Sequence, residues 1–493
     1  MSTIFSEITT VIWEYLLIYL LLSAGVYFTL RSRFVQLRYF FHAWKLMLGS
    51  RKTSGNEISS FQALCTSLAA HVGTGNLAGV AIAIFIGGPG AVFWMWVVAL
   101  LGMASSFVEN TLAQLYKTNN KDGTFRGGPA YYIEKALGLR WLGILFSVLL
   151  LITFGFVFNA VHANSVSQAF SGHMAVSPVL VGLAISGVTA FIIFRGIHSI
   201  VRFAESVVPA MALAYLLIAF GVVALRFNEM PAVITLIFES AFGLHSATGG
   251  AIGYSVSQAM MQGIKRGLFS NEAGMGSGPN AAATATPKPN HPATQGIVSM
   301  VSVFIDTIVI CTATAAIVLL SGQLEAGGTL NGIQLTQAAL ADIVGGWGQW
   351  FVSIAVIFFG FTSVIANYYY GESNLLFIRN SPRLLLAYRT IVVFLVFLGS
   401  IASLEMVWMV ADLAMGLMAL INLVIILLLS GPVMQVLKDY DLQSGSGLSP
   451  EFDRSRFPFL DRTIDKDVWV NKPESAESLD SIGNADFQET KSC

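Results

Sequence analysis

Two stretches of the chain combine glycine with polar side chains inside otherwise apolar sequence. The first surrounds Gly73, Gly75 and Gly79, and the second runs from Gly249 to Pro279. Glycine weakens a helix by about 1 kcal/mol relative to alanine, and proline removes a backbone donor, so both stretches predict interrupted helices. An interruption frees backbone groups: N–H groups at the start of a half-helix suit a carboxylate, and carbonyls at the end of one suit a cation.

The sequence around these stretches is typical of an integral membrane protein. Of its 493 residues, 55% are hydrophobic and 11% are charged, whereas a soluble domain carries about 25% charged residues. The three cysteines, Cys65, Cys311 and Cys493, are too few and too scattered for a disulfide framework or a metal site. Composition therefore disfavours a soluble enzyme, a nucleic-acid-binding protein, a secreted disulfide-rich domain and a disordered regulator.

We expect an all-α integral membrane protein with 11 transmembrane helices, because eleven apolar segments are long enough, or nearly so, to cross about 30 Å of hydrocarbon. They are 11–30, 61–86, 91–112, 142–161, 178–194, 203–225, 249–285, 296–320, 350–371, 384–400 and 406–429. The interrupted stretches fall in the second and seventh segments, which open two successive sets of five. An odd number of spans inverts the second set, and paired interrupted helices in two inverted halves are typical of a transporter site at the membrane midplane.

The distribution of Lys and Arg predicts that the N-terminus lies outside and the C-terminus in the cytoplasm. With this orientation the inner loops and the tail contain every Lys and Arg except Arg226, as the preference of positive charge for the cytoplasmic side requires. This assignment counts Lys265 and Arg266 among the residues of an inner loop.

The chain divides into three parts. Residues 1–58 form the first transmembrane helix and a basic cytoplasmic loop, and residues 59–430 form the core, with halves at about 59–226 and 231–430. Residues 431–493 form an acidic, serine-containing cytoplasmic tail, which its polar composition predicts to be disordered.

Five motifs in these segments resemble those of the sodium:alanine symporter family, which comprises alanine or glycine:cation symporters. They are Gly87–Gly102 (GGPGAVFWMWVVALLG), Val72–Gly79 (VGTGNLAG), Gly127–Glu134 (GGPAYYIE), Phe269–Gly274 (FSNEAG) and Tyr368–Glu372 (YYYGE). The resemblance implies a leucine-transporter-type inverted five-helix repeat, formed by helices 2–6 and 7–11 and preceded by one extra helix.

The resemblance also implies what the protein does. We expect a secondary active transporter in a bacterial plasma (inner) membrane that imports a small neutral amino acid, alanine or glycine first, by sodium symport with alternating access. We expect no enzymatic activity and no cofactor beyond Na⁺ as the coupling ion. The expected partners are the amino acid, sodium and the lipid bilayer, and we expect no nucleic-acid partner. The oligomeric state stays open.

The same resemblance places both ligands at the first interruption. The amides of Thr74 and Gly75, with the Thr74 hydroxyl and Asn76 beside them, would face the substrate carboxylate. The sodium ligands would be carbonyl and hydroxyl oxygens from the second and ninth segments, namely those of Ala69, Val72, Phe359, Thr362 and Ser363. The seventh segment would close the other side of the site with its candidates Gln262, Gly263, Ser270, Asn271 and Glu272.

Alternatives to these roles remain open. The Thr74 hydroxyl could instead donate to the carbonyl four residues earlier in its own helix. Glu272 could form an inner-gate ion pair with Lys265 and Arg266 rather than contact a ligand.

The coupling ion and the substrate also remain open. His71 could titrate near neutral pH and make the protein a proton-coupled symporter, and glutamine or serine could replace alanine. Asp306 and Asp412 are acids inside membrane segments, with either a functional or a structural role. A channel would share the polar midplane, whereas an intramembrane enzyme is disfavoured because its usual motifs are missing from the sequence.

Overall fold

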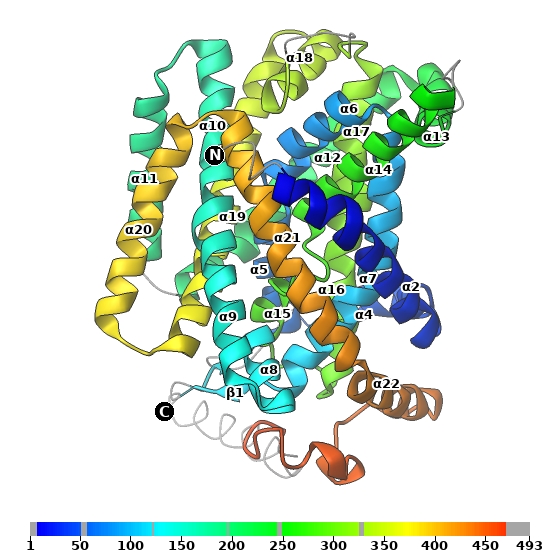
Figure 1. The fold of residues 1–493 in the computed structure, drawn as a ribbon, viewed down its shortest axis with the longest axis vertical. Coiled ribbons are helices and arrows are strands. Elements are labelled where there is room, and N and C mark those ends of the chain that lie inside the picture. Colours follow the sequence, from blue (N-terminus) through cyan, green and yellow to red (C-terminus); the bar gives the residue numbers. More distant parts are fainter. Residues whose placement is uncertain are drawn as a thin grey trace, which may run out of the picture.

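Helices form almost all of the regular structure and lie side by side in one bundle (Figure 1). The computed structural model describes residues 7–50, 57–120, 123–194, 197–243, 249–324 and 330–469. In Figure 1, we call the end that carries α18 (Ile333–Val344) the upper end. The opposite, lower end carries α8 (Pro129–Leu137) and α22 (Ser430–Gly445).

The other helices follow in chain order. They are α2 (Ile18–Arg31), α3 (Val35–Arg38), α4 (Phe40–Gly49), α5 (Ser60–His71), α6 (Val80–Gly87), α7 (Gly90–Leu115), α9 (Arg140–Leu150), α10 (Asn159–Met174), α11 (Pro178–Ile193), α12 (Ile197–Leu225), α13 (Met230–Ala241), α14 (Gly249–Asn271), α15 (Gly278–Ala282), α16 (Pro292–Val303), α17 (Thr312–Leu320), α19 (Trp347–Ile378), α20 (Pro382–Ile401) and α21 (Leu404–Leu428). Four π-helical stretches adjoin them, at Val11–Leu17, Gly75–Gly79, Leu151–Phe158 and Phe304–Cys311. Two short strands, β1 (Thr118–Asn119) and β2 (Phe125–Arg126), pair antiparallel.

The structure supports a multi-pass membrane protein but not the full predicted number of spans. Among the described residues, 8 helices are long and apolar enough to cross a membrane, or up to 9 if a bent pair counts as one span. The predicted segment 178–194 forms α11, a helix of only 16 residues. The predicted segment 249–285 forms α14, a turn and the short α15. The count of eleven is therefore not confirmed.

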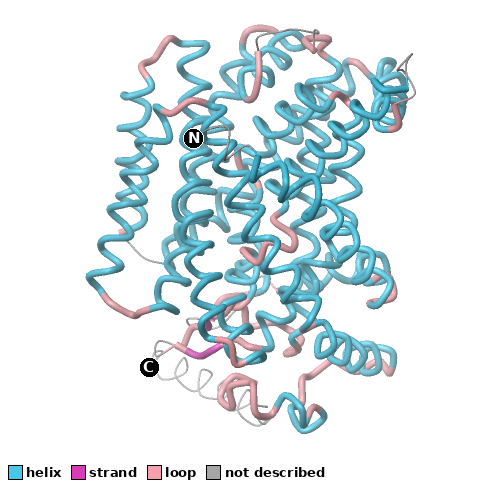
Figure 2. Tube along the Cα trace, in the orientation of Figure 1, coloured by secondary structure: helices cyan, strands magenta, loops and turns pink. Residues whose placement is uncertain are grey.

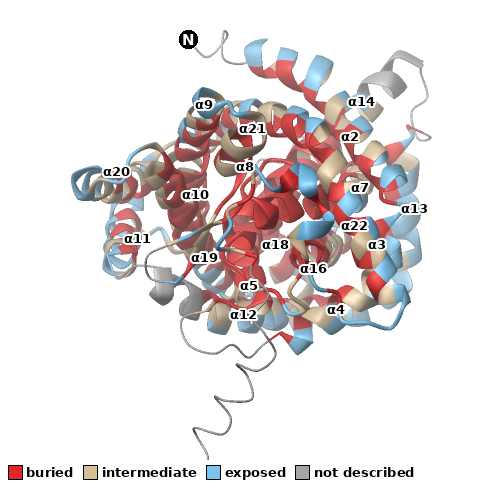
Figure 3. Cartoon of the chain, turned by 90° about the horizontal axis from the view of Figure 1, so that it is seen from below, coloured by how far each residue is buried: buried red, intermediate tan, exposed pale blue. Residues whose placement is uncertain are grey.

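The outer surface of the bundle is apolar. Seen from below, buried residues fill the centre and exposed residues line the outside (Figure 3). Large apolar side chains are exposed on outer helices, for example Leu183 on α11, Phe220 on α12 and Phe394 on α20. Water would disfavour such a surface, whereas a bilayer solvates it.

The first predicted interruption is confirmed. The α5 helix begins at a capping box in which Ser59 and Gln62 exchange side-chain and backbone hydrogen bonds of 3.0 Å each. The helix ends at His71, and the axis bends by 49° before the chain continues into α6. Gly73 lies in the bend, where a Cβ atom would overlap the Ser363 hydroxyl.

The second predicted interruption lies at residues 272–277, between α14 and α15. Gly274 (φ 86°) and Gly276 (φ 83°) adopt left-handed conformations there, and so does Glu272 (φ 57°); this region strongly favours glycine. Gly267, in contrast, lies inside α14, where its Cα faces the Val98 side chain of α7. This glycine therefore permits close helix packing and does not break the helix. Figure 2 shows loop segments within the bundle as well as at its ends.

The first part of the tail is ordered, contrary to our expectation of disorder. Residues 431–445 continue α22, and residues 446–469, which we call the C-terminal strap, lie against the lower end of the bundle. Phe452 is fully buried, and its N–H donates to the Asn290 carbonyl at 3.0 Å. Trp469 is also buried; its indole N–H donates to the Gln114 carbonyl at 3.3 Å, and its ring lies 4.6 Å from the Lys117 ammonium. The tail residues 470–493 lie outside the described part of the chain.

The strap contacts the segment that follows α15, and this segment pairs with a residue that precedes α5. Ile58, just before α5, forms a parallel bridge with Ala285, just after α15. The Thr286 N–H donates to the Ile58 carbonyl at 2.8 Å, and the Lys117 ammonium donates to the Ala285 carbonyl at 2.8 Å. Polar side-chain contacts also hold the lower end together, namely Lys135–Asp465, His291–Asp439 and Arg456–Asp439. The acidic composition did not predict an ordered strap, because a few buried apolar side chains hold the strap against the bundle.

Trp469→Ala should release the strap from the lower end. The substitution removes a buried aromatic side chain and its contact with the Lys117 ammonium, at a cost of about 3 kcal/mol or more. Hydrogen–deuterium exchange by mass spectrometry should then show faster exchange in residues 283–291 and 446–469. Phe459→Ala is the matched control, because Phe459 is an exposed aromatic residue of the same strap. Equal exchange in the two variants would show that Trp469 does not hold the strap.

Candidate functional site

Asn76 connects the two interrupted helices. Its Nδ2 donates to Ser270 Oγ of α14 at 3.1 Å and to Asp306 Oδ1 at 2.6 Å, and its Oδ1 accepts from the Gly73 N–H at 2.8 Å. A carboxamide donates and accepts at once, so one side chain satisfies a backbone group at the first break and binds two other helices. Asn76 and Ser270, both predicted substrate residues, are thus brought together and engaged with protein groups.

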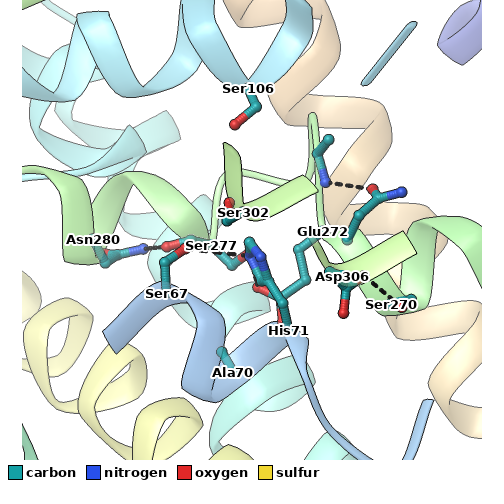
Figure 4. A network of polar contacts seen from close by, with 12 residues as sticks. Ser67, Ala70, His71, Ser106, Ser270, Glu272, Ser277, Asn280, Ser302 and Asp306 are labelled. Atoms are coloured by element: carbon teal, nitrogen blue, oxygen red, sulfur yellow. Dashed lines mark hydrogen bonds and ion pairs between the residues drawn. The ribbon is translucent and has the colours of Figure 1, made fainter. Parts of the chain in front are cut away.

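His71 and Glu272 form a second bridge between the breaks (Figure 4). His71 is the last residue of α5, and its Nε2 lies 3.5 Å from Glu272 Oε2 and 3.4 Å from Ser67 Oγ. The Ser277 hydroxyl donates to the same Glu272 oxygen. Glu272 is therefore not part of an ion pair with Lys265 and Arg266, contrary to the alternative raised from the sequence.

Glu109 of α7 satisfies the backbone of the second break. Its Oε1 accepts from the Gly274 N–H and its Oε2 from the Gly276 N–H, both at 3.2 Å. Asn422 of α21 donates to Oε2 at 3.0 Å and to the Gly274 carbonyl at 2.9 Å. Sequence reasoning missed Glu109, although an acid in a predicted membrane segment was the available signal.

Four oxygens meet where α5 ends and α19 passes. Ser363 Oγ lies 3.0 Å from the Ala69 carbonyl oxygen, 3.1 Å from that of Ala70 and 2.9 Å from that of Phe359. A serine hydroxyl has one hydrogen to donate, so only one of the three carbonyls can receive it. This surplus of acceptors favours a cation.

The remaining predicted sodium ligands adjoin the same junction. The Thr362 hydroxyl lies 3.1 Å from the Phe359 carbonyl oxygen and 2.9 Å from that of Phe358, four residues earlier, and it can donate to one of them. Val72 immediately precedes Gly73, whose Cα faces Ser363. Four of the five predicted sodium ligands, Ala69, Phe359, Thr362 and Ser363, therefore have oxygens at one junction, and Val72 lies one residue before the glycine that faces it.

The predicted carboxylate-binding backbone faces two aromatic rings. The Thr74 hydroxyl lies 2.9 Å from His162 Nδ1 of α10, so it does not make the i−4 bond considered from the sequence. A Cβ atom on Gly75 would lie 2.7 Å from the Phe269 ring. His162 was not among the predicted site residues, because only the fold brings α10 to this break.

The upper side of the site is closed by a cluster of tilted aromatic rings and an ion pair. The Phe269 ring lies 4.4 Å from that of Phe158 and 4.6 Å from that of Trp408. Above them, the Arg266 guanidinium forms a bidentate pair with Asp412 at 2.9 and 3.0 Å, and it lies 4.3 Å from the Trp408 ring. The aromatic cluster and the ion pair together join α14 to α21.

Lys265 and Arg266 do not lie in an inner loop, contrary to our assignment. Both are buried on α14, and Lys265 Nζ lies 3.7 Å from Asp412 Oδ2. They line a cavity of about 290 Å³ together with residues of the upper end such as Asn331 and Glu405. Counting positive charges placed them wrongly because their charge is compensated by Asp412 within the bundle.

The other candidates of the seventh segment have different surroundings. Asn271 donates to Thr307 Oγ1 at 3.2 Å, beside the Asp306 cluster. Gln262 lines the upper cavity, and its Oε1 has no hydrogen-bond partner among the described residues. Gly263 packs against the Ala91 carbonyl of α7, so it lies in a helix contact rather than at the break.

Comparisons with known proteins agree with this arrangement. A family model described as the sodium:alanine symporter family matches residues 1–454. The chain is 48% identical over 470 residues to the uncharacterized transporter YaaJ of Escherichia coli (strain K12), covering 95% of this chain and 99% of that protein. It is 49% identical over 442 residues to the probable sodium/glutamine symporter GlnT of Bacillus subtilis (strain 168), covering 90% and 91%. It is 39% identical over 444 residues to the sodium/alanine symporter AgcS of Methanococcus maripaludis, covering 88% and 96%.

The apolar helices and the buried polar site define a multi-pass membrane transporter. The chain belongs to the sodium:alanine symporter family, as its motifs predicted. It is a sodium-coupled amino-acid symporter and not an enzyme, and its transported partners are sodium and an amino acid. The leucine-transporter-type inverted repeat stays a prediction.

Asp412→Asn should destabilise the protein, because it leaves the Arg266 guanidinium buried beside a neutral amide. Removing one partner of a buried ion pair costs about 3–5 kcal/mol, which should lower the thermal unfolding temperature by several degrees. Intrinsic fluorescence during heating of the purified protein measures this. Glu229→Gln is the control, since it breaks the exposed Arg226–Glu229 pair of 2.9 Å, and it should leave the unfolding temperature unchanged. Equal effects of the two substitutions would contradict a structural role for the buried pair.

Proposed function

We propose that the chain imports alanine, or a closely related small neutral amino acid such as glycine, together with sodium by alternating access. The observation that carries this proposal is the junction at which Ser363 Oγ meets carbonyls of α5 and α19 within 3.1 Å. These are hard oxygen ligands from two helices, one of which is interrupted at the next turn. A sodium ion bound there would fix the geometry of the interruption.

The proposed sodium ligands are the five residues predicted from the sequence. Carbonyls of Ala69, Val72 and Phe359 would combine with the hydroxyls of Thr362 and Ser363. The two hydroxyls now donate to carbonyls, and each would turn its lone pairs to the ion on binding. Sodium would thereby stabilise the conformation of α5 that also presents the substrate site, which is sufficient for coupling.

The proposed substrate site uses the amides of Thr74 and Gly75 for the carboxylate. Half-helix N-termini favour an anion without a cationic side chain. The Phe269 ring against Gly75 leaves little room for a large substrate side chain, which supports alanine or glycine. Glutamine remains a second candidate, because a relative that is 49% identical is named a probable sodium/glutamine symporter.

Alternating access would open one end at a time. The Arg266–Asp412 pair and the aromatic cluster would form the outer closure, and the strap with the Ile58–Ala285 bridge would form the inner closure. Basic residues gather in short helices and helix ends at the lower end, for example Arg38, Lys135 and Arg140, which supports a cytoplasmic lower end, an outer N-terminus and a location in the bacterial inner membrane.

Ser363→Ala should weaken sodium-dependent uptake of labelled alanine into proteoliposomes. The substitution removes one ligand oxygen from the junction, so the sodium concentration for half-maximal uptake should rise roughly tenfold or more. Ser186→Ala is the matched control, because Ser186 is a buried serine of α11 that donates only within its own helix, to the Gly182 and Leu183 carbonyls. An unchanged sodium dependence in Ser363→Ala would exclude this junction as the coupling site.

Two further outcomes of the same assay test the other parts of the proposal. Uptake that persists when choline replaces sodium would favour the proton-coupled alternative at His71. Inhibition by unlabelled glutamine at lower concentration than by alanine or glycine would identify glutamine as the substrate and contradict the preference for a small side chain.

A further inference from the structure

Asp306 is a fully buried acid at the meeting point of both interrupted helices (Figure 4). Its Oδ1 accepts from Asn76 Nδ2 at 2.6 Å, and its Oδ2 accepts from Ser270 Oγ at 2.6 Å and from Thr307 Oγ1 at 2.8 Å. All three donors are neutral. A carboxylate has about four acceptor positions, so these contacts leave room for one further donor.

Two of the other buried acids near the site face a basic side chain. Glu272 contacts His71, and Asp412 pairs with Arg266 and Lys265. Among the ion pairs of the described residues, none involves Asp306 or Glu109, but the Glu109 oxygens hold the backbone of the second break. A buried carboxylate without a cation is costly in a membrane protein, so a positively charged group can stabilise Asp306.

Asp306 also lies within reach of the proposed carboxylate-binding backbone. Asn76, which donates to Asp306, directly follows Gly75. A Cβ atom on Gly75 would lie 3.8 Å from the Cα of Ser270, whose hydroxyl also donates to Asp306. Asp306 belongs to the π-helical stretch Phe304–Cys311, and such stretches occur frequently at functional sites. Its backbone carbonyl accepts a further hydrogen bond of 3.1 Å from Asn76.

We infer that the Asp306 carboxylate binds the α-ammonium group of the transported amino acid. This assignment rests on the proposed function. In an α-amino acid a single carbon atom separates the carboxylate from the ammonium group, so a ligand held at the Gly75 amide presents its positive group to the nearest buried anion. The ammonium occupies the acceptor position that the three neutral donors leave open.

The assignment defines the chemical class of the substrate. The ligand carries a free, protonated α-amino group, and an analogue with a hydroxyl group in its place loses the ion pair. Lactate, which differs from alanine in this group alone, therefore binds much more weakly than alanine does.

The experiment measures the binding of alanine and of lactate to purified protein in nanodiscs at saturating sodium, by calorimetry and by ligand-induced thermal stabilisation. In the wild-type protein alanine binds more tightly than lactate. In Asp306→Asn, which keeps the shape but removes the charge, this preference falls roughly tenfold to hundredfold, because a hydrogen bond to a charged group is replaced by a neutral contact. The loss appears in the affinity for alanine, while the affinity for lactate stays the same or rises, because the substitution removes a negative charge near an anion.

Thr307→Val is the matched control. It removes a hydrogen bond from the same carboxylate but keeps the charge, so the preference for alanine over lactate persists. If Asp306→Asn shows no cooperative unfolding, Asp306→Glu replaces it: the retained charge preserves the preference even where both affinities fall, and loss of the preference in Asp306→Glu overturns the assignment.

Three results contradict the inference. An equal loss of alanine and lactate affinity in Asp306→Asn identifies a structural role. An unchanged preference combined with a higher sodium requirement identifies a cation ligand. Failure of the wild-type protein to bind any amino acid overturns the proposed function, and this assignment with it.

Discussion

Backbone polar groups that leave a helix inside a bilayer must find partners within the protein, and this requirement organises the centre of the molecule. The Gly73 N–H is satisfied by Asn76, and the Gly274 and Gly276 N–H groups are satisfied by Glu109. Asn76 also binds Ser270 on the other interrupted helix. Because Asn76 binds Ser270 and His71 contacts Glu272, side chains connect the two breaks directly. A ligand that displaced one of these contacts would leave a buried polar group at each break without its partner.

The two ends of the site are closed by different kinds of interaction. The upper closure depends on the Arg266–Asp412 ion pair, whose charges water can solvate once the cavity above them widens. The lower closure depends on apolar burial of Phe452 and Trp469 in the strap. Separating apolar surfaces in water costs about 25 cal/mol per Å² of surface exposed, so opening the lower end would require a compensating interaction. Ligand binding at the breaks is where such compensation can arise.

The sequence predicted what depends on local pattern. Glycine and polar residues in one apolar stretch predicted the bend at Gly73, and motif positions placed Ser363 with Ala69. Contacts that depend on tertiary structure were missed: nothing adjacent to Glu109 in sequence shows that it will accept N–H groups from the second break.

The errors have physical causes of the same kind. Lys265 and Arg266 were assigned to a loop because a count of positive charge does not register a buried partner such as Asp412. The strap was expected to be disordered because average polarity hides a few well-spaced aromatic residues. Gly267 fell in the same predicted interrupted stretch as Gly274, although its Cα faces α7 at helix-packing distance.

If Asp306 binds the ammonium group of the substrate, the net charge of the site differs between the step with bound ligands and the step in which the empty site returns. Asp306 would contribute one negative charge to the empty site, beside Glu109 and the Glu272–His71 contact. A zwitterionic amino acid adds no net charge, and one sodium ion would offset the charge of Asp306, so the loaded site would carry one negative charge fewer than the empty site. The membrane potential changes the energy of a unit charge that crosses the membrane by about 2.3 kcal/mol per 100 mV. It would therefore drive mainly the step in which the empty carrier returns. An inside-negative potential pushes that negative charge outward, which is the direction in which the empty site must reorient before the next import.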